Sequence, residues 1–134
     1  MGALIFDGFC DGIMLLNQGT SLSHITVDTT AFGILQAGRI RTSKTEYISC
    51  PGCGRTLFNL QETLDRVKAT TYHLKRLKIG IMGCIVNGPG EMAGADFGYV
   101  GARRSKVSLY KRKECIEKNI PEEGGVDKLI ELIK

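Results

Sequence analysis

The fold is decided by one short apolar stretch, Lys78-Ile79-Gly80-Ile81-Met82-Gly83, which leads directly into Cys84. Its length and composition are typical of a buried strand, and Cys84 opens a glycine-rich turn. A second strand-like segment, Thr45–Ser49, delivers the chain to Cys50 in the same manner. We therefore expect two strands that each end at a cysteine.

The rest of residues 59–134 alternates between helix and strand patterns. Asn59, with Glu62 three residues later, resembles a capping box and predicts a helix over 59–73. This mixed order predicts an α+β fold, a mixed β-sheet with flanking helices. Three more strands are expected over 96–100, 107–110 and 115–120, the last two as a hairpin, and a helix opened by Pro121, Glu122 and Glu123 ends the chain.

The first 38 residues differ in charge from the rest of the chain. They hold three acidic residues and no Lys or Arg, so all 18 basic residues lie in 39–134. We therefore expect residues 1–38 to be the end of a preceding region and the entry into the domain formed by residues 39–134. Together the two parts are expected to form one compact domain.

Within this first part we expect two strands and one short helix. Ala3–Phe6 and Gly12–Leu16 are short apolar segments around a glycine-rich bend, which is typical of strands joined by a tight turn. The helix is expected to begin at Thr29 or Thr30 and to end at Gly38.

Composition excludes several classes of protein. With 134 residues, 43% of them hydrophobic and 24% charged, the chain can bury a core and is not disordered. No apolar run approaches the roughly 18 residues of a membrane span, and the start lacks the basic and long apolar stretches of a secretory signal. We expect no membrane contact and a location in the cytoplasm or an organelle interior.

One stretch, Gly101–Lys113, is strongly basic. Such a run suits phosphate, nucleic acid or an acidic protein partner. Nucleic acid is the weakest of the three, because no run of exposed aromatic residues is interleaved. A solvated hairpin rim is the alternative. The six basic residues, which meet no acid, are Arg103, Arg104, Lys106, Lys111, Arg112 and Lys113.

The five cysteines, at positions 10, 50, 53, 84 and 115, point to metal or redox chemistry rather than to disulfides. In Cys50-Pro51-Gly52-Cys53, proline and glycine let the backbone turn so that both sulfurs face one point. This pair suits zinc, an iron–sulfur cluster or a redox dithiol. Cys84 adds a third thiol 31 residues after Cys53.

The fourth ligand decides the function. Glu91 closes the loop that Cys84 opens. A carboxylate is a weaker and more exchangeable ligand of iron than a thiolate, so three thiolates and one carboxylate would offer one iron to a substrate. A solvated loop carboxylate is the alternative for Glu91. The other candidates are expected to be small buried hydrophobic residues (Cys10, Cys115) or surface and partly buried imidazoles (His24, His73).

Two other functions remain open on the residues alone. In a structural zinc-binding module, Cys50, Cys53 and Cys84 would brace the fold with a fourth ligand, for which zinc favours a thiol or an imidazole. A thiol–disulfide oxidoreductase is the weakest alternative, because Cys84 and Glu91 have no task in that chemistry.

Three stretches of the chain match one family: Tyr47–Thr56 (YISCPGCGRT), Met82–Glu91 (MGCIVNGPGE) and Ala95–Gly101 (ADFGYVG). They resemble the C-terminal part of the 4-hydroxy-3-methylbut-2-enyl diphosphate synthases, the iron–sulfur oxidoreductases of the non-mevalonate pathway of isoprene and terpenoid biosynthesis. The opening Gly2–Gly8 and Thr45–Tyr47 look like the larger form of this family, found in plants and some bacteria. The resemblance covers nearly the whole chain.

The resemblance implies a [4Fe–4S] cluster held by Cys50, Cys53, Cys84 and Glu91, one residue to each iron. It also implies two-electron reduction of 2-C-methyl-D-erythritol 2,4-cyclodiphosphate, with ring opening and loss of a hydroxyl group. In that reaction Glu91 gives way to the substrate, and Asn87 hydrogen-bonds the bound ligand near the cluster. For Asn87, capping of the following turn is the alternative role.

The fold that the resemblance implies is that of the [4Fe–4S] domain of sulfite and nitrite reductases. The full family chain begins with a (β/α)8 barrel that binds the substrate diphosphate, and 134 residues cannot hold it. We therefore expect this chain to be inactive alone, with the barrel supplied by another copy in a homodimer. The location would be the cytoplasm of a bacterium or the plastid interior of a plant-type source.

An acidic electron donor, ferredoxin or flavodoxin, is the partner that the resemblance and the basic stretch together suggest. Charge complementarity would guide its docking onto Arg103, Arg104 and Lys106.

Overall fold

The structure, a computed structural model, describes residues 2–19 and 21–134. It divides the chain into two compact units, Met1–Ser43 and Lys44–Lys134, called here the N-terminal and C-terminal units. The boundary lies a few residues after Arg39, where the charge of the sequence changes sign. The division into 1–38 and 39–134 stays a prediction.

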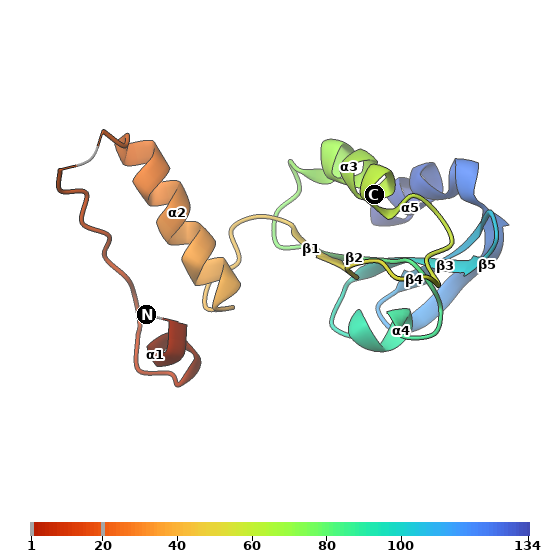
Figure 1. Cartoon of the computed structure of the whole chain (residues 1–134), viewed down its shortest axis with the longest axis horizontal. Helices are drawn as coiled ribbons and strands as arrows, with labels where there is room; N and C mark the ends of the chain where they lie inside the picture. The colour runs from red at the N-terminus through yellow and green to blue at the C-terminus, as the bar shows by residue number, and fades with distance from the viewer. Residues whose placement is uncertain (1, 20) are drawn as a thin grey trace. The chain divides into compact units, whose positions relative to one another are not determined.

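The C-terminal unit is built on one five-stranded sheet in the order β1-β2-β3-β4-β5 (Figure 1). Neighbours β1, β2 and β3 are parallel, whereas β3, β4 and β5 are antiparallel. The prediction of a mixed sheet is therefore confirmed. The strands are β1 (Glu46–Ser49), β2 (Lys78–Met82), β3 (Phe97–Arg103), β4 (Lys106–Lys111) and β5 (Glu114–Pro121), close to the predicted segments.

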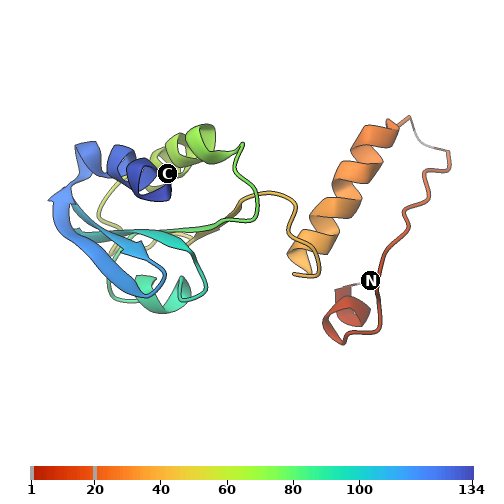
Figure 2. The same ribbon diagram turned by 180° about the vertical axis from the view of Figure 1, so that it is seen from behind.

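Helices cover both faces of this sheet (Figures 1 and 2). On one face lie α3 (Leu60–Thr71) and α5 (Gly125–Ile133), the latter preceded by the 3-10 turn η1 (Glu122–Gly124). On the other lies the one-turn helix α4 (Gly88–Glu91). The cap predicted for α3 is confirmed, because the side chain of Asn59 accepts a hydrogen bond from the backbone N–H of Glu62 at 3.2 Å.

Two apolar clusters hold these layers together. One fills the space between the sheet and helices α3 and α5, and the other lies under α4. Alternate residues of β2 enter opposite clusters, Ile81 the first and Met82 the second, as the period of a strand requires. The sheet is therefore buried on both faces. The first cluster contains Val67, Ile79, Ile81, Tyr99, Leu109 and Leu129, and the second Met82, Met92, Ala95, Val100 and Tyr110.

The N-terminal unit contains α1 (Gly2–Phe6) and α2 (His24–Ala37). The prediction of strands over Ala3–Phe6 and Gly12–Leu16 was wrong. The backbone N–H of Asp7 bonds the carbonyl of Ala3 at 2.9 Å, which closes a helical turn, and 12–16 adopts no regular structure. A strand needs a neighbour for its backbone groups, and the described part of this unit, 2–19 and 21–43, offers none.

Helix α2 begins earlier than predicted and ends where predicted. Its N-cap is Ser23, whose side chain accepts a hydrogen bond from the N–H of Thr26, rather than Thr29 or Thr30. Gly38 is its C-cap. None of the helices in the described parts of the chain has both the length and the apolar character needed to cross a bilayer.

Candidate metal centre

The thiols of Cys50 and Cys84 lie at one edge of the sheet because β1 and β2 are parallel and in register. Ser49, the last residue of β1, pairs with Ile81 of β2, so the chain leaves both strands at the same edge. The backbone N–H of Gly83 donates a hydrogen bond to Cys50 Sγ at 3.2 Å. This bond ties the cysteine after β1 to the turn that carries Cys84.

The loop after Cys50 turns tightly and presents Cys53 to the same edge. Gly52 has a φ of +81°, a conformation that favours glycine. The N–H of Cys53 donates to Thr56 Oγ1 at 3.0 Å, and the N–H of Thr56 donates to the carbonyl of Cys53 at 2.9 Å. These reciprocal bonds fix the orientation of Cys53.

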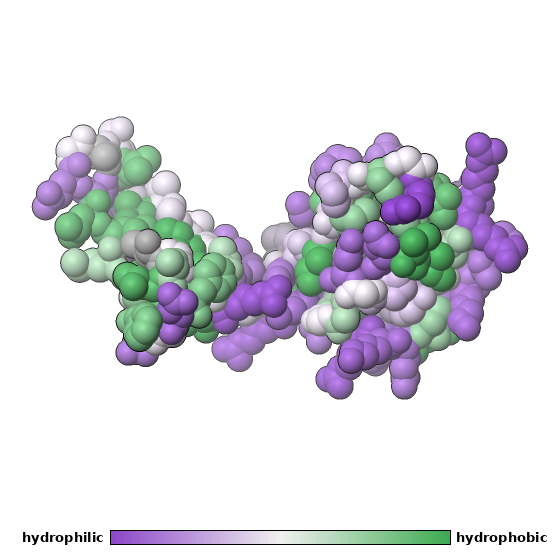
Figure 3. Space-filling view, turned by 60° about the horizontal axis from the view of Figure 1, so that its bottom comes forward, coloured by the Kyte–Doolittle hydropathy of each residue, from purple (hydrophilic) through white to green (hydrophobic). Residues whose placement is uncertain are grey.

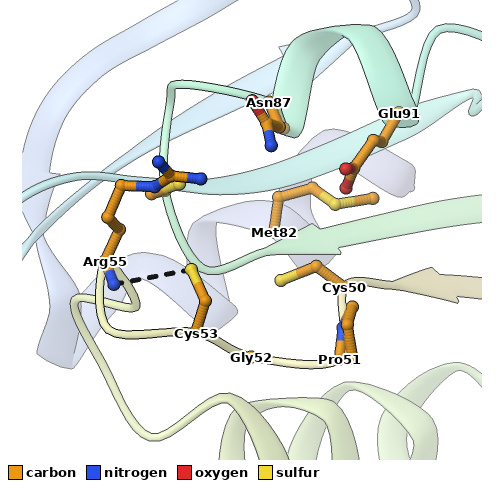
Figure 4. A pocket seen from close by; sticks show the side chains of 10 residues that line it. Cys50, Pro51, Gly52, Cys53, Arg55, Met82, Asn87 and Glu91 are labelled. Carbon is orange, nitrogen blue, oxygen red and sulfur yellow. Dashed lines mark hydrogen bonds between the residues drawn. The ribbon is translucent and has the colours of Figure 1, made fainter.

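Arg55 acts on the sulfur of Cys53. Its backbone N–H donates to Cys53 Sγ at 3.4 Å, as Figure 4 shows. This hydrogen bond lowers the pKa of the Cys53 thiol, and the positive charge of Arg55 acts in the same direction. A lowered pKa favours the thiolate, which is the form that binds metals.

The turn after β2 is pressed against its neighbours. A Cβ on Gly101 of β3 would lie 2.3 Å from the carbonyl oxygen of Gly83, and a Cβ on Gly83 would lie 2.8 Å from Thr56 Oγ1. The same Gly83 carbonyl accepts a hydrogen bond from the N–H of Leu57 at 3.1 Å. The turn after β2 is thus packed against the loop after β1 on one side and against β3 on the other, and glycine is needed at both contacts.

Helix α4 carries the carboxylate. The carbonyl of Asn87 accepts hydrogen bonds from the N–H groups of Gly90 and Glu91 at 3.1 and 3.0 Å, which closes the single turn. Glu91, expected in a loop, is therefore the last residue of a short helix. The side chain of Asn87 makes no capping bond, so the capping role considered for it is wrong. Gly88 packs against Met82 and Val100 and anchors the turn on the sheet.

One pocket of about 130 Å³ is lined by all five residues predicted to form the site, namely Cys50, Cys53, Cys84, Asn87 and Glu91. Figure 4 shows Cys50 and Cys53 entering it from the loop after β1, and Asn87 and Glu91 entering from α4. Pockets for drug-sized organic ligands usually measure roughly 300–1,000 Å³. The volume therefore suits a compact inorganic group. The residues that line it are Cys50, Pro51, Gly52, Cys53, Arg55, Met82, Cys84, Asn87, Gly88 and Glu91.

The remaining cysteines and histidines do not line this pocket. Cys115 lies on β5 beside the cluster that contains Tyr110, and its thiol donates to the carbonyl of Glu117 at 3.6 Å. His73 stacks edge-on against Tyr72, with ring centroids 5.8 Å apart. Cys10 and His24 belong to the N-terminal unit.

The donors do not converge on a single point. Among residues 2–19 and 21–134, no group of three or more His, Cys, Asp and Glu side chains is placed to hold one metal ion. A structural zinc ion needs four donors about 2.0–2.3 Å from one centre. A cubane cluster instead takes its protein ligands on separate irons. Three thiols and a carboxylate thus line one pocket without meeting at one point.

Sequence reasoning missed three residues of this site: Arg55, Thr56 and Met82. Arg55 and Thr56 follow the C-x-x-C pair directly, and Met82 precedes Gly83 at the end of β2. Their position beside a thiol-bearing turn was the available signal. Which of them faces the pocket depends on the turn geometry, which the sequence does not specify.

Comparison with known proteins identifies the family. The family model described as "GcpE protein C-terminal domain" matches residues 46–134. A protein of Bacteroides fragilis is 81% identical over all 134 residues, which make up 21% of its length. Proteins of Phocaeicola vulgatus and Bacteroides thetaiotaomicron are 80% and 75% identical over the whole chain, which makes up 22% of each.

All three relatives are named 4-hydroxy-3-methylbut-2-en-1-yl diphosphate synthase (flavodoxin). The chain spans about a fifth of the length of the curated relatives that it matches. Since the family model covers more than half of the chain, including every residue of the pocket, the chain belongs to the family of GcpE protein C-terminal domains.

Proposed function

We propose that this chain is the cluster-bearing part of an oxidoreductase that converts 2-C-methyl-D-erythritol 2,4-cyclodiphosphate to 4-hydroxy-3-methylbut-2-enyl diphosphate by two-electron reductive ring opening and dehydroxylation. The observation that carries the proposal is the gathering of three thiols and one carboxylate around one pocket. The names of relatives up to 81% identical support the reaction.

The cofactor is a [4Fe–4S] cluster, with Cys50, Cys53, Cys84 and Glu91 as its ligands. When bound, the cluster supplies electrons and a Lewis-acidic iron to the reaction. The chemistry of the donor set supports it, because thiolates are the usual ligands of iron–sulfur clusters. The lowered pKa of Cys53 favours the thiolate form that a cluster iron binds.

Glu91 and Asn87 are the residues that meet the substrate. Glu91 is exposed at the end of a one-turn helix, so its carboxylate can move without disturbing the core. A carboxylate also holds a cluster iron less firmly than a thiolate does. The amide of Asn87 makes no capping bond and can hydrogen-bond a substrate hydroxyl. Arg55 lines the same pocket, where its charge favours an anionic substrate.

The rest of the reaction needs more protein than this chain. The diphosphate pocket belongs to a barrel domain, supplied by another copy in a homodimer, so the chain alone binds iron and sulfide without turnover. Support comes from the length of the relatives, of which the chain is about a fifth. The fold would be that of the [4Fe–4S] domain of sulfite and nitrite reductases, which the mixed sheet with its helices on both faces supports. The electron donor is flavodoxin, named with the relatives, or ferredoxin.

Anaerobic iron and sulfide analysis of the reconstituted chain tests this function. We expect about four irons and four sulfides per chain. Cys84→Ser should abolish most of this binding, whereas Cys115→Ser, a thiol outside the pocket, should leave it unchanged. Zinc without sulfide in the unsubstituted chain would instead support the structural module held by Cys50, Cys53 and Cys84.

A further inference from the structure

The fold divides the basic stretch Gly101–Lys113 between two edges of the sheet. In the antiparallel pair of β3 and β4, Arg103 lies opposite Lys106 at one end, and Phe97 lies opposite Lys111 at the other. From Lys106 to Lys111 the strand advances by five residues, which is about 17 Å. The six basic residues therefore do not form one patch.

Only one half of the stretch lies near the pocket. Strand β3 is parallel to β1 and β2, so its carboxyl end, at Arg103, lies at the edge where Cys50 and Cys84 follow their strands. Lys111 ends β4 at the opposite edge, and residues 112–113 form the turn there.

The two faces of the sheet differ in charge at the thiol-bearing edge. On the side of α3, a hollow beside Ser105 is lined by Glu62, Glu122 and Glu123, with Arg66 as its basic residue. A second hollow, of about 430 Å³, is lined by Ile85, Tyr110 and Cys115 together with Arg103 and Lys118, and its lining within the described chain includes no Asp or Glu. Of these two hollows, the one beside Ile85 is therefore the basic one.

Apolar surface lies beside that charge. Ile85 and Val86 follow Cys84 directly and are 48% and 63% exposed. Arg103 and Lys118 are also exposed. An apolar centre with a charged rim is typical of protein–protein interfaces, and a rim of one sign attracts a partner of the opposite sign.

We propose that the basic edge, formed by Ile85, Val86, Arg103 and Lys118, is the docking surface for an acidic electron-carrier protein. The inference rests on the proposed function, because a partner of this kind is needed only if the pocket holds a redox cluster. Its location follows from the chain itself, since Ile85 is the residue after the ligand Cys84. A carrier seated there lies against the turn that holds the cluster.

Charge reversal at two places on the same sheet tests the location. The test variant is Arg103→Glu with Lys118→Glu, and the matched control is Lys111→Glu with Lys113→Glu at the opposite edge. All four positions are exposed, and both variants change the net charge equally. The probe is an acidic bacterial flavodoxin, titrated against the reconstituted 134-residue chain at low ionic strength, with the dissociation constant as the first readout.

We expect the test variant to weaken binding about tenfold or more, and the control to stay within about twofold. The difference should shrink at high salt, where exposed charges are screened. As a second readout, reduction of the chain by reduced flavodoxin should slow in the test variant only, while reduction by dithionite stays equal in all three proteins. The melting temperature verifies that the variants fold. If charge reversal prevents folding, the test variant becomes Arg103→Gln with Lys118→Gln, and binding should again be weaker than in the control.

Equal weakening in the test variant and the control would overturn the proposal, and so would unchanged binding in both. Failure of the proposed function can be told apart from failure of the docking proposal. If the chain bound no iron and sulfide, neither reductant would reduce it, but the dissociation constants of the variants would still show where flavodoxin binds.

Discussion

The C-terminal unit buries its apolar side chains on both faces of a sheet, whereas the N-terminal unit exposes most of its own. Among the described residues 2–19 and 21–43, Ile5 is the only buried side chain. Figure 3 shows apolar surface over this unit. Its exposed large apolar residues include Leu4, Phe6, Phe9, Met14, Leu16, Leu22 and Ile25.

The difference shows what the pocket requires. Its residues come from two loops and a one-turn helix, elements that hold no fixed geometry on their own. The buried sheet and the glycine contacts at Gly83 and Gly101 supply that geometry. Secondary structure without a buried core, as in the N-terminal unit, does not supply such a geometry.

Truncation of one leucine in each unit should give the largest contrast. Leu129 is fully buried, and Leu129→Ala should lower the free energy of unfolding by about 2–5 kcal/mol. Leu16 is 70% exposed, and Leu16→Ala should change the free energy of unfolding by less than about 0.5 kcal/mol. Urea unfolding measures both. A loss from Leu16→Ala as large as that from Leu129→Ala would show that the N-terminal unit has a core after all.

Substitution of the β3 glycine that faces the turn after β2 should damage the pocket. In Gly101→Ala the new methyl group meets the Gly83 carbonyl at 2.3 Å, so the backbone must shift at a cost of about 1–3 kcal/mol, and bound iron should fall sharply. Gly54→Ala is the control, because a Cβ there meets no atom within 4 Å although Cys53 is adjacent. Equal iron content in the two variants would mean that the close approach does not shape the site.

The two helix caps allow the same comparison at a smaller scale. Asn59 caps α3 and Ser23 caps α2, each accepting a hydrogen bond from a backbone N–H three residues on. Asn59→Ala should cost the C-terminal unit about 1 kcal/mol, and Ser23→Ala should leave it unchanged. All four tyrosines lie in the C-terminal unit, so tyrosine fluorescence during urea unfolding reports on that unit alone. A shift of this transition by Ser23→Ala would reveal coupling between the units.

The smallest effect concerns the phenol of Tyr99 in the C-terminal core. Its hydroxyl has no hydrogen-bond partner in the described structure, and burial raises its pKa to about 12. The unfolded phenol has a pKa of about 10, so the folded protein retains the proton of Tyr99 to a higher pH than the unfolded chain does. The stability linked to this proton is full below about pH 10 and is lost as the pH rises towards 12.

Ultraviolet titration of tyrosine ionisation measures this shift. Tyr99→Phe should remove the highest-pH phase, and at neutral pH it should cost little stability because no hydrogen bond is lost. Ionisation of all four tyrosines near pH 10 would show that Tyr99 is accessible to water.

Much of the C-terminal unit could be predicted because local pattern and burial agree there. The run from Lys78 ends at a cysteine and is apolar on both faces, and Asn59 has the right neighbour for a cap. The segment Gly12–Leu16 has an equally good strand pattern but adopts no regular structure in this chain. A pattern shows what a segment can form, and the partner that completes it lies elsewhere in the chain.

The thiols and the carboxylate that line the pocket could be predicted, but their surroundings could not. Cysteine spacing pointed to the three thiols and family resemblance to Glu91, and all four side chains line the same pocket. The division of the basic stretch Gly101–Lys113 into two separate groups could not be predicted, because it follows from strand direction. The antiparallel pairing of β3 and β4 places Arg103 and Lys113 at opposite edges of the sheet. A linear sequence does not show strand direction. The same holds for α4, a single turn stabilised by its contact with Met82 and Val100 rather than by helix propensity.

Mössbauer spectroscopy of the anaerobically reconstituted chain tests the central claim most directly, because it reports the environment of each iron. Three thiolates and one carboxylate predict two iron environments in a ratio of about three to one. Glu91→Ala should change only the minor component, and Glu114→Ala, a carboxylate outside the pocket, should change neither. Four equivalent irons, or a minor component that survives unaltered in Glu91→Ala, would contradict the assignment of Glu91 as a ligand.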